Sequence, residues 1–384
     1  MKIDVLASTK LGHWEGTRDM LRLSGLEAGI CYMPKDYKNL IREQIDKTMQ
    51  RANGTVENGH HSVTGHPSYN LVLIDIPKIL AMLLNNEKEY TTSEKSGRYT
   101  VMTAANEEER QLYEKWREKF AKMIAEEYPE IPARTVNKLA MENARLFISV
   151  FTPATTMGYT VSLRQANYLI GFCEKMISES NLTPFYQKLI PYLVEFSDNL
   201  RKIVNVEGLR ENFGRGFSLF GSEEREEYFG DVYSTNYLES FVGLASALRH
   251  RSLWYEMRLP EEKMFYAAPI IAEDSETFAE YMDDMHSVAD NFPQGMLVEV
   301  NERGTTEAFI MKCHERLCGA TQPEICQQTR TTLDRYILST SKRMATKRIA
   351  EELRKLKGKI KCQMGFSCRQ PCALGPEQVF SRKI

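Results

Sequence analysis

The first half of the chain shows two kinds of hydrophobic pattern. Residues 2–7 alternate between apolar and polar side chains, and residues 69–76 (YNLVLIDI) form a short apolar run, so both stretches predict strands. Pro77 follows the second strand, where a helix can begin because the missing proline N–H would have no partner. The apolar run after it predicts a helix that ends near Asn85. Further helices are predicted at 36–53, 107–128, 135–150, 164–177 and 183–204, and a loop rich in glycine and histidine at 54–67.

A similar order of elements recurs in the second half. Residues 207–230 lack clear periodicity and predict a connection. Residues 236–248 are apolar and predict a helix that leads into Arg249, and Asn86 holds the equivalent position in the first half. The two positions lie 163 residues apart, a spacing that indicates duplication of a whole domain. Later helices are predicted at 275–291, 305–317 and 322–357.

Composition narrows the class of protein. The chain has 384 residues, of which 42% are hydrophobic and 27% charged, as in globular proteins. Its net charge of −2 argues against a polybasic surface for nucleic acid or membrane. The chain has neither an apolar run of roughly 18 residues, as a membrane helix needs, nor a secretory signal at its start. We therefore expect a cytoplasmic protein whose eight cysteines are thiols or metal ligands.

Residues 93–99 (SEKSGRY) form the first candidate binding motif. Gly97 stands between Ser96 and Arg98, so the backbone can come close to a ligand. Backbone N–H groups, a hydroxyl and a guanidinium together suit a phosphate or a pyrimidine ring. Glu94 could accept a hydrogen bond from a base N–H or a ribose hydroxyl. Taken alone, the segment is explained more simply as a polar surface turn.

Arg249-His250-Arg251 forms the second motif, at the end of an apolar segment. Three adjacent potential cations on a buried helix need anionic partners, which a nucleotide phosphate or a flavin would supply. A solvated helix end would explain the triplet equally well, because the helix dipole favours cations at the C-terminus.

Glu315-Arg316-Leu317 and Gln322-Pro323-Glu324-Ile325 form the third motif. Arg316 and Gln322 lie six residues apart across a break that contains glycine. In isolation these residues are explained most simply as a surface helix–turn–helix.

Together the motifs resemble the flavin-dependent thymidylate synthases. The family's signature joins an Arg-His-Arg triplet to a Glu-any-Ser-any-Arg-Tyr loop, with paired histidines upstream. Ala-Arg, Asn-any-Arg and Arg…Gln-any-Glu-Ile elements lie downstream. In the first half, His60 and His66 match the paired histidines, and residues 93–99 match the loop. Ala144-Arg145 matches the Ala-Arg element, and Ser162-Leu163-Arg164 matches the Asn-any-Arg element with Ser in place of Asn.

The two halves complement each other. In the first half, Asn86-Glu87-Lys88 occupies the Arg-His-Arg slot and cannot reproduce its chemistry. The second half keeps 249–251 and Arg316, but its loop slot, which begins at Met257, is lost, and its Ala-Arg slot falls near Ala289. Each half has therefore lost what the other kept, which suits a composite site.

The resemblance implies the fold and the reaction. It implies an α+β fold of two tandem flavin-dependent thymidylate synthase-like domains, each a mixed sheet flanked by long helices. We place them at 1–205 and 206–345, followed by a basic, cysteine-rich tail at 346–384. The implied reaction methylates C5 of dUMP with methylenetetrahydrofolate, FAD and NADPH. The family site lies between subunits of a homotetramer, so two duplicated chains would form an equivalent homodimer.

The resemblance also assigns residues. Arg145 and Arg316 are the catalytic candidates, because either could stabilise charge developing on a pyrimidine carbonyl. No enzyme cysteine attacks the base in this family, so Cys31 and Cys173 are not nucleophiles, and His61 and His66 are expected to be structural. The substrate candidates are Glu94, Ser96, Gly97, Arg98, Arg145, Ser246, Arg249 and Arg316, and the FAD candidates are His60, Ser62, Glu94, Arg164, Arg249, His250 and Arg251.

The tail adds a possible metal site. Cys362, Cys368 and Cys372, with Cys318, could hold a zinc ion or an iron–sulfur cluster, although their spacing matches no standard finger. Free or buried thiols are the alternative.

Two other functions stay open. Loss of the first-half triplet allows a non-catalytic protein that binds nucleotide or flavin. Ser246 stands where the family usually has Gln, and this change allows a different flavin-dependent C5 chemistry, such as hydroxymethylation.

Overall fold

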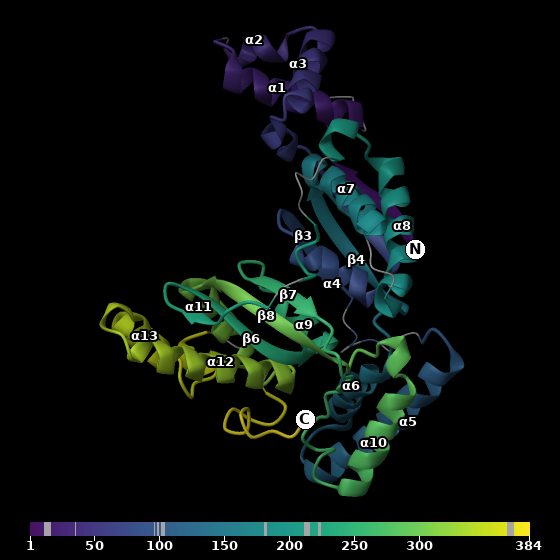
Figure 1. The fold of residues 1–384 in the computed structure, drawn as a ribbon, viewed down its shortest axis with the longest axis vertical. Coiled ribbons are helices and arrows are strands. Elements are labelled where there is room, and N and C mark those ends of the chain that lie inside the picture. The colour runs from purple at the N-terminus through teal and green to yellow at the C-terminus, as the bar shows by residue number, and fades with distance from the viewer. Residues whose placement is uncertain are drawn as a thin grey trace. The chain divides into compact units, whose positions relative to one another are not determined.

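The computed structural model divides the chain into two compact units whose sequences interleave (Figure 1). The first unit comprises Met1–Lys95 and Pro153–Phe217, and the second comprises Ser96–Thr152 and Ser218–Ile384. The units are treated separately below. The structure describes residues 1–10, 17–34, 36–95, 97, 100, 104–179, 183–210, 216–221, 224–366 and 372–384.

A four-stranded sheet organises the first unit, in the order β1-β2-β4-β3. Its long central strands alternate between buried and half-buried side chains, because one face packs against the core. Helix α4 is buried along almost its whole length. The strands are β1 (Lys2–Ser8), β2 (Ser68–Pro77), β3 (Tyr90–Glu94) and β4 (Pro153–Ser162); the helices are α1 (Thr17–Tyr32), α2 (Tyr37–Ile41), α3 (Ile45–Glu57), α4 (Lys78–Asn86), α7 (Leu163–Glu179) and α8 (Pro184–Ile203), with 3-10 turns η1 (His61–Gly65) and η3 (Glu207–Arg210).

The second unit contains a sheet of the same design, in the order β5-β6-β8-β7. Its strands are β5 (Tyr228–Phe229), β6 (Val232–Ser240), β7 (Trp254–Arg258) and β8 (Leu297–Thr305). The helices are α5 (Glu107–Glu127), α6 (Ala133–Ala144), α9 (Phe241–Ala247), α10 (Ser275–Ser287), α11 (Thr306–Arg316), α12 (Pro323–Ser341) and α13 (Lys347–Arg354), with 3-10 turns η2 (Arg145–Phe147), η4 (Ala289–Asn291), η5 (Met344–Thr346) and η6 (Lys361–Met364).

The two sheets share one topology. In each, a helix follows the first long strand (α4 or α9), and two helices follow the second (α7 and α8, or α11 and α12). The triplets 86–88 and 249–251 therefore occupy equivalent places at the ends of α4 and α9. Glu87 and His250, the middle residues of these triplets, are both buried. This correspondence supports the slot equivalence predicted from sequence.

The expectation of mixed sheets is wrong, because all pairings between the named strands are antiparallel. Strands β2 and β3 run in the same direction, as a strand–helix–strand connection predicts. However, β4 inserts between them and pairs antiparallel with both. The pair β6 and β7 is separated by β8 in the same way.

Several element boundaries also differ from the sequence expectations. The helix predicted at 36–53 is two helices separated by Arg42–Gln44, and the loop predicted at 54–67 contains the end of α3 and the turn η1. The first part of 236–248 belongs to strand β6, because its alternating side chains pair with β8. The helix predicted at 135–150 ends at Ala144, the one at 275–291 ends at Ser287, and 322–357 is interrupted between α12 and α13.

An aromatic cluster joins residues 96–152 to the remainder of the second unit. Trp116 of α5 is fully buried, lies parallel to Phe147 at 5.7 Å between ring centroids, and meets Tyr281 of α10 edge-on at 4.9 Å. Its indole Nε1 donates to Asp284 of α10 at 2.7 Å. Helices α5, α6 and α10 therefore form one layer, although α10 lies more than 100 residues away in sequence (Figure 1).

The segments around Ser149 and Pro293 pair reciprocally through their backbones. Ser149 and Pro293 form an antiparallel bridge. The Val150 N–H donates to the Phe292 carbonyl, and the Gln294 N–H donates to the Ile148 carbonyl, both at 2.9 Å. Turn η2 precedes the first segment and turn η4 the second, and the sequence separation from η2 to β4 equals that from η4 to β8. Equivalent residues of the two halves thus contact each other about a local two-fold axis, as in an isologous interface.

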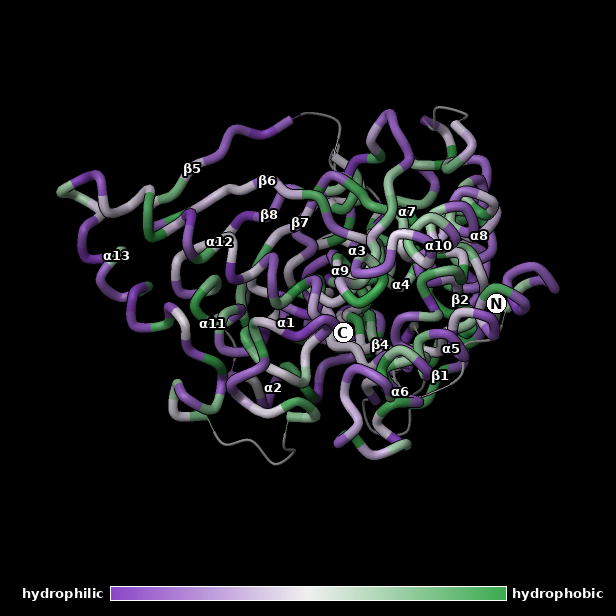
Figure 2. The backbone as a smooth tube through the Cα atoms, turned by 90° about the horizontal axis from the view of Figure 1, so that it is seen from below, coloured by the Kyte–Doolittle hydropathy of each residue, from purple (hydrophilic) through white to green (hydrophobic). Residues whose placement is uncertain are grey.

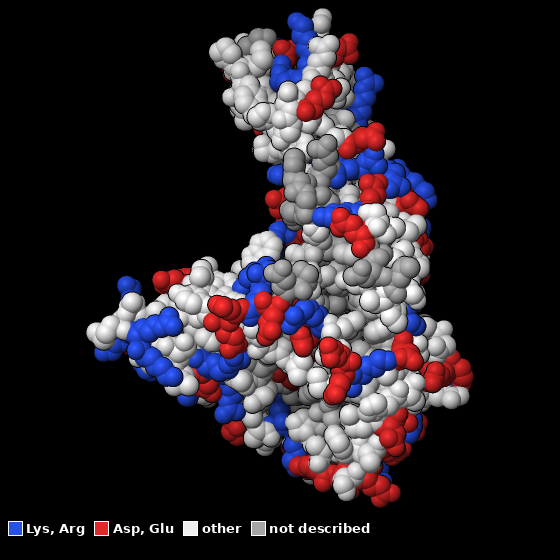
Figure 3. Space-filling view, viewed as in Figure 1, with Lys and Arg blue, Asp and Glu red and all other residues white. Residues whose placement is uncertain are grey.

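The surface of the second unit around helix α13 is polar. Helix α13 is drawn largely in the hydrophilic colour of Figure 2, and only Ala350 and Leu353 of it are buried. Lysine and arginine side chains gather over this end of the unit in Figure 3. Within the described ranges, no helix combines the length and apolar character needed to cross a membrane.

We expect Trp116→Ala to lower the free energy of unfolding by about 3–5 kcal/mol, because it leaves a cavity between α5 and α10. The indole hydrogen bond to Asp284 is lost as well. Denaturant unfolding of the full chain measures the change. Lys122→Ala, at a side chain that is 78% exposed on the same helix, is the matched control. A Trp116 variant as stable as the control would contradict this account of the layer.

Candidate functional site

Arg145 lies where the two halves of the sequence meet within the second unit. It caps α6 and is 7% exposed. Its Nε donates to the Glu142 carbonyl at 3.1 Å, and its Nη2 donates to Gln322 Oε1 at 3.2 Å. Gln322 caps the N-terminus of α12. The structure therefore brings the Ala-Arg motif of the first half to the Gln-Pro-Glu-Ile motif of the second.

Glu324 continues this chain of contacts. It lies in the first turn of α12 and accepts from the backbone N–H and the hydroxyl of Ser240, at 2.6 and 2.5 Å. Gln322 Nε2 approaches the same carboxyl at 3.4 Å. Burial raises the pKa of Glu324 to about 7, although the Ser240 hydrogen bonds and the charge of Arg145 oppose the shift. The group can therefore gain or lose a proton near neutral pH.

Glu239 is a second acid in this region. It is fully buried on β6, and both of its carboxylate oxygens lack a hydrogen-bond partner among the described residues. Burial, followed by the nearby charge of Glu324, raises the pKa of Glu239 well above its ordinary value. Lys312 and Arg316 oppose that shift. The protonated form of Glu239 is therefore strongly favoured.

Arg316 and His250 form a dyad at the other side of the cluster. Arg316 Nε donates to His250 Nε2 at 2.8 Å, so the imidazole accepts and is neutral. Burial, followed by the charge of Arg316, lowers the pKa of His250 to about 2. Arg249 and Arg251 on either side are exposed. The triplet therefore directs its histidine inward and presents two arginines at the surface.

A buried ion pair supports the cluster and was missed from the sequence. Lys312 and Glu302 have no exposed side-chain surface, and Lys312 Nζ donates to Glu302 Oε2 at 2.5 Å. The hydroxyls of Tyr233 and Tyr237 each donate to Glu302 at 2.6 Å. Glu302 on β8 thus contacts Lys312 on α11 and two tyrosines on β6, so the ion pair links these three elements. Removing one partner would leave an uncompensated buried charge. The alternating residues 297–302 (LVEVNE) were the available signal.

The loop candidates lie partly outside the described residues. Ser96 and Arg98 lie outside them, while Gly97 is placed in a turn. Ser93 and Glu94 belong to strand β3 rather than to a loop. Lys78 Nζ donates to Glu94 at 2.6 Å, and Asn85 Nδ2 donates to its second oxygen at 3.3 Å. The Glu94 carboxylate is therefore already oriented by its own unit.

The flavin candidates of the first unit surround the turn η1 and the start of α7. His60 and Ser62 are exposed. Arg164 lies over the Tyr168 ring at 5.2 Å, and its buried Nε has no hydrogen-bond partner within the described part of the chain. His61 is buried and its ring contacts the Tyr168 hydroxyl at 2.7 Å, as expected for a structural histidine.

Ser246 is committed to its own helix. Its hydroxyl donates to the Val242 carbonyl at 3.1 Å, one turn earlier in α9. This serine therefore satisfies its hydroxyl locally, and its half-buried side chain needs no external partner.

The cysteine-rich tail gives no support for a metal. Among the residues the structure describes, no three His, Cys, Asp or Glu side chains gather as metal ligands would. Cys362 is exposed, and Cys318 and Cys372 are half-buried. Cys368 lies outside the described residues. The metal site therefore has no support among the described residues.

One family model and one solved structure are similar to this chain. The family model described as "Thymidylate synthase complementing protein" matches residues 16–180, which confirms the resemblance found in the sequence. A solved structure of a flavin dependent thymidylate synthase from Helicobacter pylori, complexed with FAD and dUMP, is 12% identical. That comparison covers 53% of this chain and 100% of the other, with a TM-score of 0.32. No curated protein sequence matches the chain.

We expect Glu324→Gln to become more stabilising as the pH rises from 5 to 8. The folded protein keeps the Glu324 proton up to about pH 7, whereas the unfolded chain releases it near 4.5, so ionisation removes stability across that interval. The difference from the parent protein should grow by about 1–3 kcal/mol and level off above pH 7. Thermal and denaturant unfolding at each pH measure it.

Glu261→Gln, at an exposed glutamate of the same unit, is the control for this series. A difference between Glu324→Gln and the parent that stays constant with pH would show that the folded state does not hold this proton.

Proposed function

From the family match of residues 16–180, we propose that the chain binds FAD and a pyrimidine deoxynucleotide and transfers a one-carbon unit to C5 of the base. The simplest such reaction converts dUMP to dTMP. Methylenetetrahydrofolate would be the carbon donor and NADPH the reductant of the flavin, in the cytosol.

The contact between Arg145 and Gln322 carries this proposal. It joins motifs from opposite halves of the sequence inside one unit. The halves have lost complementary parts of the family signature, so only a pooled set of residues could serve a nucleotide. The dyad of Arg316 and His250 adds a second cation to the same region.

The proposed roles follow from this geometry. Neutral His250 orients the Arg316 guanidinium through Nε, so this cation is preorganised before a ligand arrives. Arg316 or Arg145 would then withdraw electrons from a pyrimidine carbonyl and activate C5. Ser96, Gly97 and Arg98 would hold the phosphate, and this positioning is itself a large part of catalysis.

The flavin residues fit an anionic, aromatic cofactor. Arg249 and Arg251 are exposed cations beside a buried histidine, and Arg164 has a buried Nε with hydrogen-bonding capacity to spare. His60 and Ser62 add exposed polar groups, and Glu94 remains the candidate shared with the substrate. Bound FAD would supply the redox chemistry, and the protein would bind and orient it.

A second candidate function is a non-catalytic protein that binds nucleotide or flavin. The buried Glu87 stands where His250 stands in the other half, so the first triplet offers an acid in place of an imidazole. The Glu94 carboxylate already accepts hydrogen bonds from Lys78 and Asn85, which also favours the non-catalytic candidate. A different C5 chemistry, such as hydroxymethylation, would be distinguished by the mass of the product.

We expect Arg316→Lys to reduce dTMP formation by about 100-fold. Lysine has a single ammonium group, so it cannot donate to His250 Nε2 as Arg316 Nε does and also face a pyrimidine carbonyl with a planar guanidinium. Tritium release from 5-tritiated dUMP, with FAD, NADPH and methylenetetrahydrofolate, measures turnover. Arg110→Lys, on the surface of α5, should retain the parental rate. Nucleotide binding without tritium release from the parent protein would favour the non-catalytic candidate.

We also propose a homodimer, equivalent to a tetramer of undivided subunits. The local two-fold pairing about Ser149 and Pro293 supports it, because one symmetric contact of such an assembly would already lie within the chain. Light scattering should give twice the monomer mass of 44.3 kDa. A mass of one chain at micromolar concentration would refute this assembly.

A further inference from the structure

A basic segment, residues 342–361, follows helix α12 in the second unit. It contains nine lysines and arginines and only two acidic residues, Glu351 and Glu352. The net charge of −2 averages this segment with an acidic remainder, so it does not describe the local surface. The segment comprises turn η5, helix α13 and the start of turn η6. Figure 3 shows lysine and arginine side chains gathered over this part of the unit.

Most cations of the basic segment are available to a partner. Eight of the nine are exposed, and Lys361 is half-buried. Among the residues that the structure describes, five of them form no ion pair: Lys342, Arg343, Lys347, Arg348 and Lys359. Lys355 pairs with Glu352 at 2.6 Å, and Lys357 pairs with Asp334 at 3.0 Å. Exposed pairs of this kind contribute little to stability, so a polyanion can replace their acidic partners.

Helix α13 spaces two of these cations along one side. Lys347 and Arg354, its first and last residues, are seven positions apart, so they lie on the same side about 10 Å apart along the helix axis. The major groove of a nucleic-acid duplex is about 12 Å wide. Glu351 is also exposed on this helix, and Arg354 Nη2 donates to the Ser341 hydroxyl at 2.5 Å. The two cations therefore have the spacing needed to contact phosphates on the two sides of one groove.

The apolar side chains of the basic segment are largely committed to the core. Ala350, Leu353, Leu356 and Ile360 are buried. A helix that lies on a membrane surface needs an exposed apolar face, and no apolar side chain of α13 is exposed. Met344 is 87% exposed, but single exposed apolar residues are common on protein surfaces. The segment therefore favours a partner that is bound through charge.

The basic segment contains no aromatic residue. Proteins that hold single-stranded nucleic acid combine cations with aromatic side chains on which the bases stack. A duplex carries about one phosphate charge per 1.7 Å of its axis and needs no such stacking. Contacts to phosphates carry no direct sequence information. The composition of the segment therefore suits a double helix that is bound without sequence preference.

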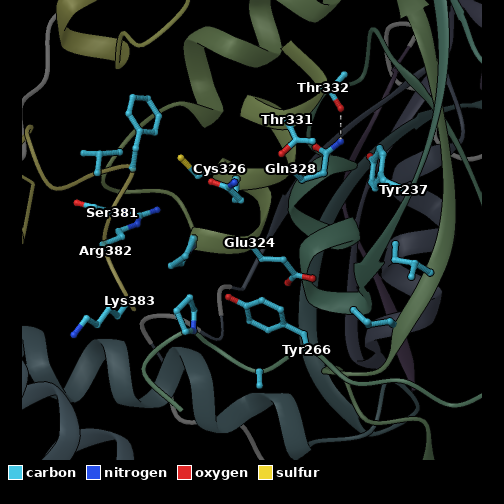
Figure 4. A pocket seen from close by; sticks show the side chains of 18 of the residues that line it. Tyr237, Tyr266, Glu324, Cys326, Gln328, Thr331, Thr332, Ser381, Arg382 and Lys383 are labelled. Carbon is cyan, nitrogen blue, oxygen red and sulfur yellow. Dashed lines mark hydrogen bonds between the residues drawn. The ribbon is translucent and has the colours of Figure 1, made fainter. Parts of the chain in front are cut away.

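The cations beside helix α12 already have partners. This helix lines a pocket of about 590 Å³, in which Figure 4 shows Arg382 and Lys383. Both Nη atoms of Arg382 donate to backbone carbonyls at 2.5 Å. Lys383 Nζ pairs with Glu127 at 2.6 Å, and Arg335 is ion-paired with Glu227. Positive charge without an acidic partner is therefore found on the basic segment rather than on these pocket residues.

We propose that the basic segment binds the phosphates of a double-stranded nucleic acid. Its five cations without ion pairs make the first contacts, and Lys355 and Lys357 exchange their acidic partners for phosphates. DNA and RNA duplexes share this chemistry. The surface goes beyond the proposed function, since it requires neither a flavin nor a nucleotide substrate.

Fluorescence anisotropy of the full chain with labelled DNA and RNA duplexes of mixed sequence tests the proposal. We expect a dissociation constant below about 10 μM at about 50 mM salt, and a loss of affinity of about 100-fold or more at about 200 mM salt. The duplex that binds more tightly identifies the source of the phosphates. An oligothymidine single strand and vesicles that contain phosphatidylserine are measured at the same salt concentrations.

Lys347→Glu combined with Arg348→Glu should weaken duplex binding by about tenfold or more. The slope of the logarithm of affinity against that of salt concentration should fall by about two, because each lost phosphate contact lowers it by about one. Glutamate is favourable in the first turn of a helix, so α13 should keep its fold, and thermal melting checks this. Lys122→Glu combined with Arg134→Glu is the matched control, because it changes the net charge equally at exposed positions of α5 and α6.

The proposal fails if neither duplex binds, or if the substitutions on α13 weaken binding no more than the control substitutions do. Binding of the single strand more than about tenfold tighter than either duplex would overturn the assignment to a double helix. Binding of the vesicles without binding of the duplexes would assign the surface to a membrane instead. Absence of flavin binding or of tritium release would refute the proposed function and leave this result untouched.

Discussion

Backbone hydrogen bonds around Ser149 and Pro293 hold together elements that the sequence places far apart. They pair a segment before β4 with its counterpart before β8 and set η2 beside η4. Arg145 belongs to η2, so the same pairing brings its guanidinium to the N-terminus of α12. Phe147, one residue before Ile148, also belongs to the aromatic layer of Trp116 and Tyr281, so the pairing and the layer are continuous along the chain. Because the contact is reciprocal, it is the kind of contact that two copies of one ancestral domain would make.

The buried acids of the second unit avoid uncompensated negative charge in two ways: one is ion-paired, and the others are stabilised in their protonated form. Glu302 and Lys312 neutralise each other, and the hydroxyls of Tyr233 and Tyr237 also donate to the carboxylate. Among the residues that the structure describes, neither carboxylate oxygen of Glu239 has a hydrogen-bond partner, and Glu324 lies nearby. A buried acid without a donor is costly when ionised, and protonation avoids that cost. Neutral His250 follows the same logic beside Arg316. Arg145 and Arg316 keep their positive charge beside these groups.

Local patterns predicted much of the fold. The strands at 2–7 and 69–76 and the helix after Pro77 were correct because their periodicity and their proline signal are local. Strand β4 was not predicted, although its threonines and valine are β-branched residues that favour strands. Arg145 and Arg316 were predicted as catalytic residues; the structure places them against Gln322 and His250, and their role stays a prediction. Glu239, Glu302 and Lys312 were missed, since their burial results from strand order, which depends on contacts remote in sequence.

The interleaving of the units affects synthesis on the ribosome. The chain passes between units at 95–96, 152–153 and 217–218. The first unit is complete in sequence once Phe217 has emerged, but α5 and α6 must wait for α10, which ends at Ser287. During that interval the apolar side chains of Trp116, Phe120 and Phe147 lack the Tyr281 surface that later covers them. Apolar surface left uncovered at this stage favours aggregation, so completion of α10 is the step that would remove this risk.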